Sequence, residues 1–482
     1  MLSRMLSPTS PERSYKEHQV TGIRWMMSRE TLPSKGGLLC DDMGLGKTEQ
    51  ILGLIANTDL VHTLLLCPKS LIGQWIREGI RCMYKVFVIQ KAAWKCISSA
   101  SSPSSASPSS VKKVKYIYIT NYDTLISKPQ LFKQHFDRLC LDEAHQYLCN
   151  KSGKMYQQVY VIKRRTTWPI TATPLVNSTK DTKNLLSLIG YDSRTLEELP
   201  LELLVSEAVL HRSMDELRTV LPNLPSAAIH TTLSLDFASE DESDFYQGVQ
   251  GKLVKRWKSL EKDRTPMLFQ LLMKLRQLSI HPQVYIGARK REPFGYSRDS
   301  WNAPSAKFLA VHDLLNKQKE PTKWIIFCQF RDEMDLIENE LMETADVYQY
   351  HGGLSDEQKE TVLRDTEAPL NGKHMVLLLN IKSGGVGLNL QHFTRIIFMS
   401  PWWTSALMRQ SVGRAVRIGQ LEQVKVYHLV LKEENSLNID AMMRDKMELK
   451  EQLLVDLLKS ASRGHLKPRE SLSNDIEENV RD

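Results

Sequence analysis

Short apolar runs alternate with helical patterns in two separate stretches of this 482-residue chain. Between residues 36 and 175 the runs are GGLLC, HTLLLCP, KYIYIT, RLCLDEAH and TTWPITATP, and from Lys323 onward they are KWIIFCQF, DVYQYH, MVLLLN, RIIFMS and VKVYHLV. Strands that alternate with helices are typical of parallel α/β sheets, because parallel neighbours need a long crossover connection. Residues from about 180 to 300 lose the strand pattern and read as helices. The sequence therefore predicts two α/β lobes with helical insertions between them.

The length supports more than one domain, because single hydrophobic cores stop growing at about 250–300 residues. We expect a first lobe at residues 1–195, a helical insertion and linker at 196–300, a second lobe at 301–465 and a flexible tail at 466–482. The run AMMRDKMELKEQLLVDLL is amphipathic and is expected to form a C-terminal brace helix.

The composition disfavours several classes of protein. No apolar run approaches the roughly 18 residues of a membrane helix, and the start MLSRMLSPTSPERSY lacks the apolar stretch of a secretory signal. We expect an intracellular protein without a membrane partner, nuclear if the source is eukaryotic, and a viral source would fit as well. None of the seven cysteines forms a C-x-x-C pair, which disfavours a zinc module or a disulfide framework.

The positive charge is concentrated in one window. The net charge is +8, and residues 251–292 contain 11 Lys or Arg against 3 acidic residues. A basic patch of this kind suits a polyanion such as nucleic acid. A solvated helix face is the alternative, and charge alone leaves both interpretations open.

The stretch GGLLCDDMGLGKTEQIL, residues 36–52, predicts a phosphate-binding loop. Gly44 and Gly46 allow successive backbone N–H groups to face phosphate oxygens, Lys47 can reach the β- and γ-phosphates, and Thr48 offers a hydroxyl to Mg²⁺. The loop lies between an apolar run and a helical run, which places the phosphates at a helix N-terminus. It departs from the general pattern because Asp41 occupies the position of the first glycine.

A second motif lies about 95 residues downstream, where the apolar run RLCLDEAH ends in Asp142 and Glu143. In a nucleotide site Asp142 would hold Mg²⁺ through water, and Glu143 would polarise the attacking water. An acidic pair that caps the next helix is the alternative. Together with the Gly-Lys-Thr upstream, the pair indicates a site that hydrolyses a nucleoside triphosphate.

With these two motifs the chain resembles the helicase-like ATPases of superfamily two, and among them the SWI/SNF-type chromatin-remodelling ATPases. The resemblance covers nearly the whole chain and follows, in order, YKEHQVTGIRWMM, DDMGLGKT, ITATPLVNS, MKLRQLSIHP, KWIIFCQF, NIKSGGVGLNL and QSVGRAVRIGQ. It implies two RecA-like lobes that close on ATP and Mg²⁺. Three positions depart from the family pattern: Asp42 replaces glutamate, Ala172 replaces glycine and Val416 replaces histidine.

The phrases SGGVGLNL and SPWWTSA most resemble the branch that contains the helicase-like transcription factor and postreplication-repair translocases. Members of that branch often have a RING zinc module between the lobes. This chain lacks the cysteine pairs for one, so we expect no ubiquitin-ligase activity from it.

The resemblance also implies a set of site residues. Nucleotide binding is expected from Gln19 at the adenine, and from Asp41, Asp42, Met43, Gly44, Leu45, Gly46, Lys47, Thr48 and Gly387. Thr48 and Asp142 are expected to hold Mg²⁺, and nucleic acid is expected to contact Lys69, Thr120, Gln329 and Lys382. Catalysis is expected from Lys47, Glu143, Gln410, Arg414 and Arg417.

The last three of these are spaced i, i+4 and i+7, which predicts one shared helical face. From that face Arg414 and Arg417 could stabilise charge on the γ-phosphate.

The expected function is that of a DNA-stimulated ATPase that translocates on double-stranded DNA and remodels chromatin or other DNA-bound proteins, with nucleosomes among the candidate partners. Two alternatives stay open. One is a catalytically weak scaffold of the same fold that binds DNA, and the other is an RNA helicase.

Overall fold

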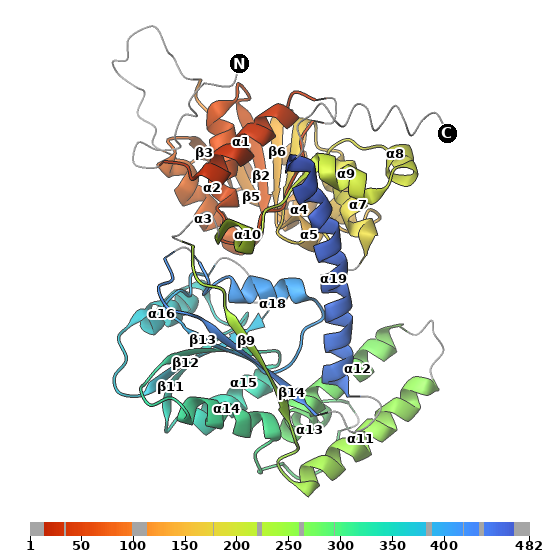
Figure 1. Ribbon diagram of the computed structural model, residues 1–482, viewed down its shortest axis with the longest axis vertical. Coiled ribbons are helices and arrows are strands. Elements are labelled where there is room, and N and C mark those ends of the chain that lie inside the picture. The colour runs from red at the N-terminus through yellow and green to blue at the C-terminus, as the bar shows by residue number, and fades with distance from the viewer. Residues whose placement is uncertain are drawn as a thin grey trace. The chain divides into compact units, whose positions relative to one another are not determined.

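The computed structural model describes residues 14–32, 35–98, 113–176, 178–218, 224–259, 265–293, 295–381, 388–417, 419–432 and 438–466. The chain forms two compact units. It passes from unit 1 to unit 2 between residues 222 and 223 and returns to unit 1 between residues 449 and 450. Each unit is built on one sheet of mostly or wholly parallel strands, which confirms the two predicted α/β lobes (Figure 1).

Among its described residues, unit 1 has an eight-stranded sheet in the order β4-β3-β5-β2-β6-β7-β1-β8. Neighbouring strands are parallel except β3 and β4, which form an antiparallel pair. The strands are β1 (Leu38–Leu39), β2 (His62–Cys67), β3 (Lys85–Gln90), β4 (Ala93–Cys96), β5 (Tyr116–Asn121), β6 (Phe136–Asp142), β7 (Arg164–Ile170) and β8 (Val209–Leu210). The central strands β2 and β6 are largely buried, so their sequences read as nearly continuous apolar runs.

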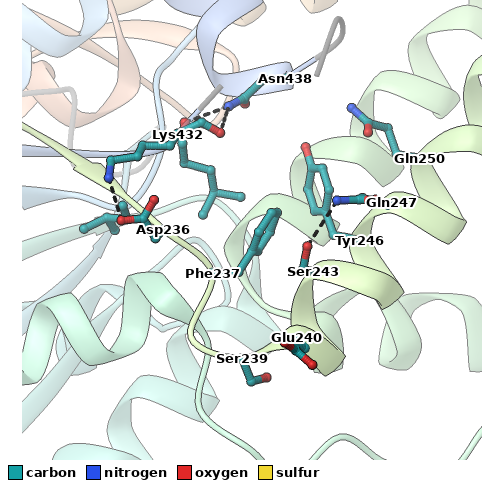
Figure 2. A pocket seen from close by; sticks show the side chains of 12 residues that line it. Asp236, Phe237, Ser239, Glu240, Ser243, Tyr246, Gln247, Gln250, Lys432 and Asn438 are labelled. Carbon is teal, nitrogen blue, oxygen red and sulfur yellow. Dashed lines mark hydrogen bonds and ion pairs between the residues drawn. The ribbon is translucent and has the colours of Figure 1, made fainter. Parts of the chain in front are cut away.

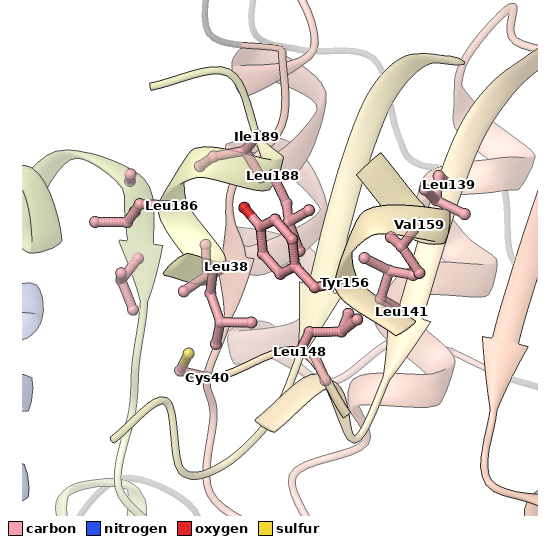
Figure 3. Packing of buried hydrophobic residues seen from close by; sticks show 14 of the residues in the cluster. Leu38, Cys40, Leu139, Leu141, Leu148, Tyr156, Val159, Leu186, Leu188 and Ile189 are labelled. Atoms are coloured by element: carbon pink, nitrogen blue, oxygen red, sulfur yellow. The ribbon is translucent and has the colours of Figure 1, made fainter. Parts of the chain in front are cut away.

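Helices and short 3₁₀ turns connect these strands. They are α1 (Glu17–Arg29), α2 (Lys47–Asn57), η1 (Lys69–Leu71), α3 (Ile72–Arg81), α4 (Tyr122–Ser127), η2 (Pro129–Phe132), α5 (Ala144–Tyr147), α6 (Lys154–Tyr160), α7 (Thr179–Leu188), α8 (Ser193–Glu198), α9 (Leu201–Ala208) and α10 (Met214–Arg218). The side chains of β1, β6, α6 and α7 form one hydrophobic core (Figure 3). The predicted C-terminal helix is present as α19 (Ile439–Leu466), and its Leu454, Leu457 and Leu458 belong to this core.

A buried ion pair fixes α1 to the sheet. Arg138 in β6 is fully buried, and its Nε and Nη2 donate to the two carboxylate oxygens of Glu30, each at 2.7 Å. Thr166 and Trp168 of β7 also donate to Glu30 Oε1. This fork satisfies both charges inside the core, as a buried ion pair requires. Because Glu30 caps the C-terminus of α1, the pair also fixes the helix that contains Gln19.

Unit 2 has, within its described residues, a six-stranded sheet in the order β11-β12-β10-β13-β14-β9, and all neighbouring strands are parallel. The strands are β9 (Ile229–Leu235), β10 (Lys323–Cys328), β11 (Ala345–Tyr350), β12 (His374–Asn380), β13 (Arg395–Phe398) and β14 (Lys425–Leu431). The helices are α11 (Glu240–Lys258), α12 (Thr265–Ile280), α13 (Pro282–Lys290), α14 (Ala306–Asn316), α15 (Arg331–Leu341), α16 (Asp356–Glu367), α18 (Ser405–Val412) and the first turns of α19.

The region predicted to be purely helical, 180–300, contains two strands. Strand β8 extends the sheet of unit 1 beside β1, and β9 pairs with β14 along its whole length in unit 2. The side chains of β9, IHTTLSL, are all exposed or half-buried, so no apolar run marked the strand. The predicted separate segment at 196–300 is accordingly divided, because residues up to 222 group with unit 1 and the remainder with unit 2.

All seven cysteines lie among the described residues and are free in the structure. No helix among the described residues is long and apolar enough to cross a bilayer.

Candidate nucleotide site

The predicted phosphate loop connects β1 to α2 in unit 1. Gly44 and Gly46 have φ angles of 86° and 79°, in the left-handed region that glycine adopts at little cost. A Cβ at Gly46 would lie 2.4 Å from the side-chain amide nitrogen of Gln19, so a larger residue would displace Gln19 and would also be strained at this positive φ. Because α2 begins directly at Lys47, free N–H groups of its first turn are available to an anion.

Gln19 lies against this loop from α1. Its Nε2 donates to the carbonyl of Leu45 at 3.4 Å, and its Oε1 accepts from the backbone N–H of Lys16 at 3.0 Å. His18 also contacts the Leu45 carbonyl, through Nε2 at 2.9 Å. Gln19 is therefore a neighbour of the loop, and its expected contact with adenine stays a prediction.

The ammonium of Lys47 lies at the mouth of the loop. Its Nζ donates to the carbonyls of Asp41 at 2.7 Å and Asp42 at 3.2 Å. Its charge also lowers the pKa of Asp142 and of His145, which places it electrostatically beside the end of β6. The structure thus brings the two sequence motifs together.

The carboxylates of Asp41 and Asp42 have hydrogen-bond partners within unit 1, and the expected contact of these two residues with a nucleotide stays a prediction. Asp41 is fully buried, and it accepts hydrogen bonds from Arg212 Nε at 3.0 Å and from Gln50 Nε2 at 2.9 Å. Asp42 Oδ2 accepts from the backbone N–H of Met214 at 2.8 Å. Both carboxylates therefore anchor the segment after β8 to the loop, a task that explains why acidic residues stand at its start.

The remaining loop residues behave differently from one another. Leu45 is fully buried and packs inward, so only its backbone can face a ligand. Met43 and Thr48 are half-buried, and Thr48 lies in the first turn of α2.

Asp142 is the last residue of β6 and has fixed orientation. Its Oδ2 accepts from Trp75 Nε1 at 2.8 Å, its Oδ1 accepts from the N–H of Glu143 at 3.0 Å, and its carbonyl accepts from Tyr122 at 2.8 Å. Burial of the carboxyl group and the neighbouring charge of Glu143 raise the pKa of Asp142 to about 7, although the Trp75 hydrogen bond and the Lys47 ammonium oppose them. A cation bound at this carboxylate would favour its ionised form.

Glu143 adopts a backbone conformation that is unusual for a residue with a side chain. Its φ of 49° and ψ of 42° lie in the left-handed region. Such strain costs about 1–3 kcal/mol and persists where the surroundings over-determine it, often at functional sites. The residue follows the β6 strand directly, at the sheet edge where the phosphate loop also lies.

A hydrogen bond connects the acidic motif to the segment after β7. His145 Nδ1 lies 2.7 Å from Thr171 Oγ1, and the N–H of Thr173 donates to the same Oγ1 at 3.0 Å. Burial is the main cause that lowers the pKa of His145 to about 4, so the imidazole is neutral at physiological pH. Thr171 and Thr173, which take part in these hydrogen bonds, are the two neighbours of Ala172, the position where the family has glycine.

The donor set fits ATP with Mg²⁺. Among the described residues no group of three His, Cys, Asp or Glu could hold a metal ion by itself. Mg²⁺ in phosphoryl-transfer sites needs only one or two protein oxygens, because phosphates and water supply the remaining ligands. Thr48 and Asp142 are residues of the right kind for this task.

The raised pKa of Asp142 gives a prediction about stability. Its folded pKa of about 7 exceeds the ordinary value of 3.8, so its stabilising contribution is complete below about pH 4 and is lost as the pH rises through 7. Asp142→Asn removes this loss. We expect the variant to exceed the wild type in unfolding free energy by on the order of 2–4 kcal/mol at pH 8 and by much less at pH 5. Urea denaturation at both pH values measures this, and equal differences at the two would contradict it.

In unit 2 the structure brings Arg414 and Arg417 together but not on a helix. Helix α18 ends at Val412, with Gly413 as its C-cap, so the predicted shared helical face with Gln410 is wrong. Gln410 is buried within α18, and the two arginines follow in the next turns. Arg417 Nε donates to the carbonyl of Gly413 at 3.0 Å. Burial, reinforced by the charge of Arg414, lowers the pKa of Arg417 to about 10, so the Arg417 guanidinium remains charged at neutral pH.

The four predicted nucleic-acid contacts have different outcomes. Lys69 is exposed at η1, as a contact residue should be. Thr120 is only 4% exposed near the end of β5, and its contact with nucleic acid stays a prediction. Gln329 Nε2 donates to Ser400 Oγ at 2.5 Å and to the Pro401 carbonyl at 3.4 Å, so its amide serves unit 2 itself. Lys382 lies outside the described residues, as does Gly387 of the predicted nucleotide set.

The basic window between residues 251 and 292 is partly neutralised by acidic neighbours. Glu292 pairs with Lys274 at 2.9 Å and with Arg289, and Arg291 pairs with Asp332 at 2.6 Å. Among the side chains that the structure describes, Lys252, Lys255 and Arg256 of α11 are exposed. Part of the positive charge of the window is therefore paired within unit 2, and its role as a polyanion site stays a prediction.

Unit 2 also has a cavity of about 330 Å³ where β9 and β14 end and α11 begins (Figure 2). Lys432 Nζ and Asp236 Oδ2, 2.5 Å apart, lie on one side of it, and Tyr246 and Gln247 lie on the other. None of the predicted site residues lines this cavity.

Comparison with known proteins identifies two domains in the same order as the two units. Residues 18–198 match the SNF2-related domain, and residues 306–419 match the helicase conserved C-terminal domain. The first match contains the phosphate loop, Asp142 and Glu143, and the second contains Gln410, Arg414 and Arg417.

The curated relatives include proteins longer than this chain and one of similar size. The chain is 27% identical over 453 residues to SWI/SNF-related matrix-associated actin-dependent regulator of chromatin subfamily A member 1 of Mus musculus. This aligned region covers 86% of this chain and 41% of the relative. It is 26% identical over 497 residues to the ISWI chromatin-remodeling complex ATPase ISW1 of Saccharomyces cerevisiae, covering 96% and 42%. It is 26% identical to a probable global transactivator of Orgyia pseudotsugata multicapsid polyhedrosis virus, covering 87% of each chain.

The chain thus spans about two fifths of the first two relatives, and the more specific branch predicted from SGGVGLNL and SPWWTSA stays a prediction. The two domain matches, in the expected order, and this set of relatives confirm the resemblance to SWI/SNF-type ATPases that the sequence motifs indicated. The chain therefore belongs to the SNF2-related family of helicase-like ATPases.

Proposed function

We propose that this protein is a DNA-stimulated ATPase that moves along double-stranded DNA and thereby remodels chromatin or other DNA-bound proteins. The observation that carries the proposal is the convergence in unit 1 of a glycine loop at a helix N-terminus, Lys47 and the pair Asp142–Glu143. Family membership and relatives named as chromatin-remodelling ATPases support the choice of DNA.

In this mechanism each residue of unit 1 has one task. The amides of residues 44–48 and the Lys47 ammonium bind the β- and γ-phosphates. Mg²⁺, held by Thr48 and through water by Asp142, would neutralise charge on the phosphates. Glu143 orients the attacking water and accepts its proton, and Gln19 contacts the adenine.

Unit 2 would complete the reaction. We assign Arg414 and Arg417 to the γ-phosphate, where two guanidiniums stabilise the charge that spreads over its oxygens. ATP would then be hydrolysed between the two lobes, and hydrolysis would depend on their closure. Gln410 and Gly387 would lie on the unit 2 side of this site, and Lys69 and Lys382 would contact DNA phosphates.

The test is ATP hydrolysis by the purified chain alone and with duplex DNA, single-stranded DNA or RNA. We expect duplex DNA to stimulate hydrolysis most and Lys47→Ala to abolish it, whereas Lys151→Ala, which changes an exposed lysine of the same unit, should leave it intact. Displacement of a third strand from a DNA triplex, with the duplex left paired, would then report translocation. Stimulation by RNA alone would favour the RNA helicase, and DNA binding without hydrolysis would favour the scaffold.

A further inference from the structure

The segment Ser400–Thr404 connects β13 to α18 and so leads directly to Gln410, Arg414 and Arg417. It contains two adjacent tryptophans. Trp402 is 8% exposed and belongs to the same hydrophobic core as Val412, Ala415 and Val416. Since protein cores are close-packed, a shift of this ring would be transmitted to the arginine segment that packs beside it.

Arg276, from α12, holds this segment by three contacts. Its guanidinium carbon lies 4.8 Å from the ring centroid of Trp402 and 5.0 Å from that of Trp403. Its Nη2 donates to the carbonyl of Pro401 at 3.2 Å, and the residue is only 1% exposed. A desolvated guanidinium against two indole faces is the strong form of the cation–π interaction. Both tryptophan rings are therefore in contact with a cation of unit 2 itself, so they serve packing within this unit.

The charge of Arg276 is kept inside unit 2 by nearby acidic groups. Burial lowers its pKa to about 10, and the carboxylates of Asp440 and Glu333 oppose that shift, so the side chain stays charged at neutral pH. Asp440 is itself fixed, because it lies 2.6 Å from Lys307 Nζ and accepts from Ser279 Oγ at 3.3 Å. This buried network gives Arg276 a rigid base.

A second side chain, that of Gln329 directly after β10, also holds the segment Ser400–Thr404. Gln329 donates to Ser400 Oγ and to the Pro401 carbonyl that Arg276 also contacts. The buried guanidinium of Arg276 and the half-buried amide of Gln329 thus converge on one carbonyl immediately before the tryptophans.

We propose that Arg276 is a positioning residue for ATP hydrolysis: by holding Pro401, Trp402 and Trp403 it sets the place of Arg414 and Arg417. This inference rests on the proposed function, because it assigns those two arginines to the reaction. Arg276 itself touches no reacting atom.

The kinetic test compares Arg276→Met, which keeps most of the volume and removes the charge, with Arg298→Met as a matched control. Arg298 also stacks on an aromatic ring of unit 2, Phe245 at 4.2 Å, but that ring is remote in sequence from the tryptophan segment. With saturating duplex DNA we expect Arg276→Met to lower kcat on the order of 10- to 100-fold, the cost of a small misplacement of catalytic groups. We expect its KM for ATP to change little, since the phosphate loop lies in unit 1, and we expect Arg298→Met to keep the wild-type kcat.

A double-mutant cycle separates positioning from general damage. If Arg276 acts through the two arginines, Arg276→Met should slow the Arg417→Ala variant by a much smaller factor than it slows the wild type, because only the placement of Arg414 is left to lose. Effects that multiply, or an unchanged kcat in folded Arg276→Met, would overturn the proposal. Arg276→Lys keeps the charge and loses the planar stack, so we expect an intermediate kcat, and it takes the place of the Met variant if that one does not fold.

Hydrogen exchange tests the same inference without catalysis. Peptides that cover residues 401–417 should exchange faster in Arg276→Met than in Arg298→Met or the wild type. If the wild type hydrolyses no ATP, the proposed function fails, and the exchange result still decides whether Arg276 positions the segment. Equal exchange in the two variants would overturn the positioning role.

Discussion

Glu143→Gln is expected to lower ATP turnover about 10³-fold and to leave nucleotide binding within about twofold. Glutamine has the shape of glutamate and can still orient water, but it cannot accept the proton. The strained left-handed backbone at Glu143 gives the side chain one defined direction from the end of β6. Steady-state hydrolysis with duplex DNA and equilibrium binding of a fluorescent ATP analogue measure the two quantities.

The matched control is Glu198→Gln, because this glutamate of unit 1 forms an exposed pair with Arg194 and has no place in the site. We expect its turnover to equal that of the wild type. Wild-type turnover in Glu143→Gln would mean that another group activates the water. Loss of nucleotide binding in the same variant would instead assign Glu143 to holding the loop.

The sequence was sufficient for the central strands and the loop because their signals are local. Strands β2, β6, β10 and β12 each contain a run of buried apolar residues, and no distant partner is needed to recognise them. The glycines at 44 and 46 follow from the positive φ that the loop requires. For the same reason the helix after the loop and the acidic pair after β6 were predictable.

The roles of Asp41 and Asp42 were not predictable because their partners are distant in sequence. Arg212 and Met214 lie more than 170 positions away, and they reach the loop only because β8 lies beside β1. Nothing in the sequence around residue 210 marks a strand of two residues. The half-buried Arg212 is brought to Asp41 by the strand order of the sheet, which the local sequence does not reveal.

The helical face predicted for the arginines failed for a local reason. Gly413 ends α18 one residue before Arg414, and the spacing rule assumed that the helix continued. Val416, which stands where the family has histidine, is 9% exposed and packs in the core of unit 2. This position therefore contributes apolar packing to the arginine segment instead of a polar contact.

Arg417→Ala is expected to lower kcat with duplex DNA by about 10³-fold, the effect typical of an arginine that stabilises the charge of a transferring phosphoryl group. Its side chain is half-buried, and its Nε hydrogen bond goes to Gly413 in its own turn, so its removal should disturb the core little. Arg414 is 4% exposed, so Arg414→Ala should lower both turnover and the unfolding temperature.

The control for Arg417 is Arg409→Ala, because Arg409 is an exposed arginine of the same segment, on α18. We expect its kcat to stay within about twofold of the wild type, since an exposed arginine loses little on truncation. Kinetics and thermal unfolding of the three variants separate chemistry from stability. Equal kcat values for Arg417→Ala and Arg409→Ala would remove Arg417 from the reaction. A loss in Arg417→Ala without a shift in unfolding temperature would mean that unit 2 supplies charge stabilisation to a nucleotide whose phosphate loop belongs to unit 1, so that neither unit alone could hydrolyse ATP at the full rate.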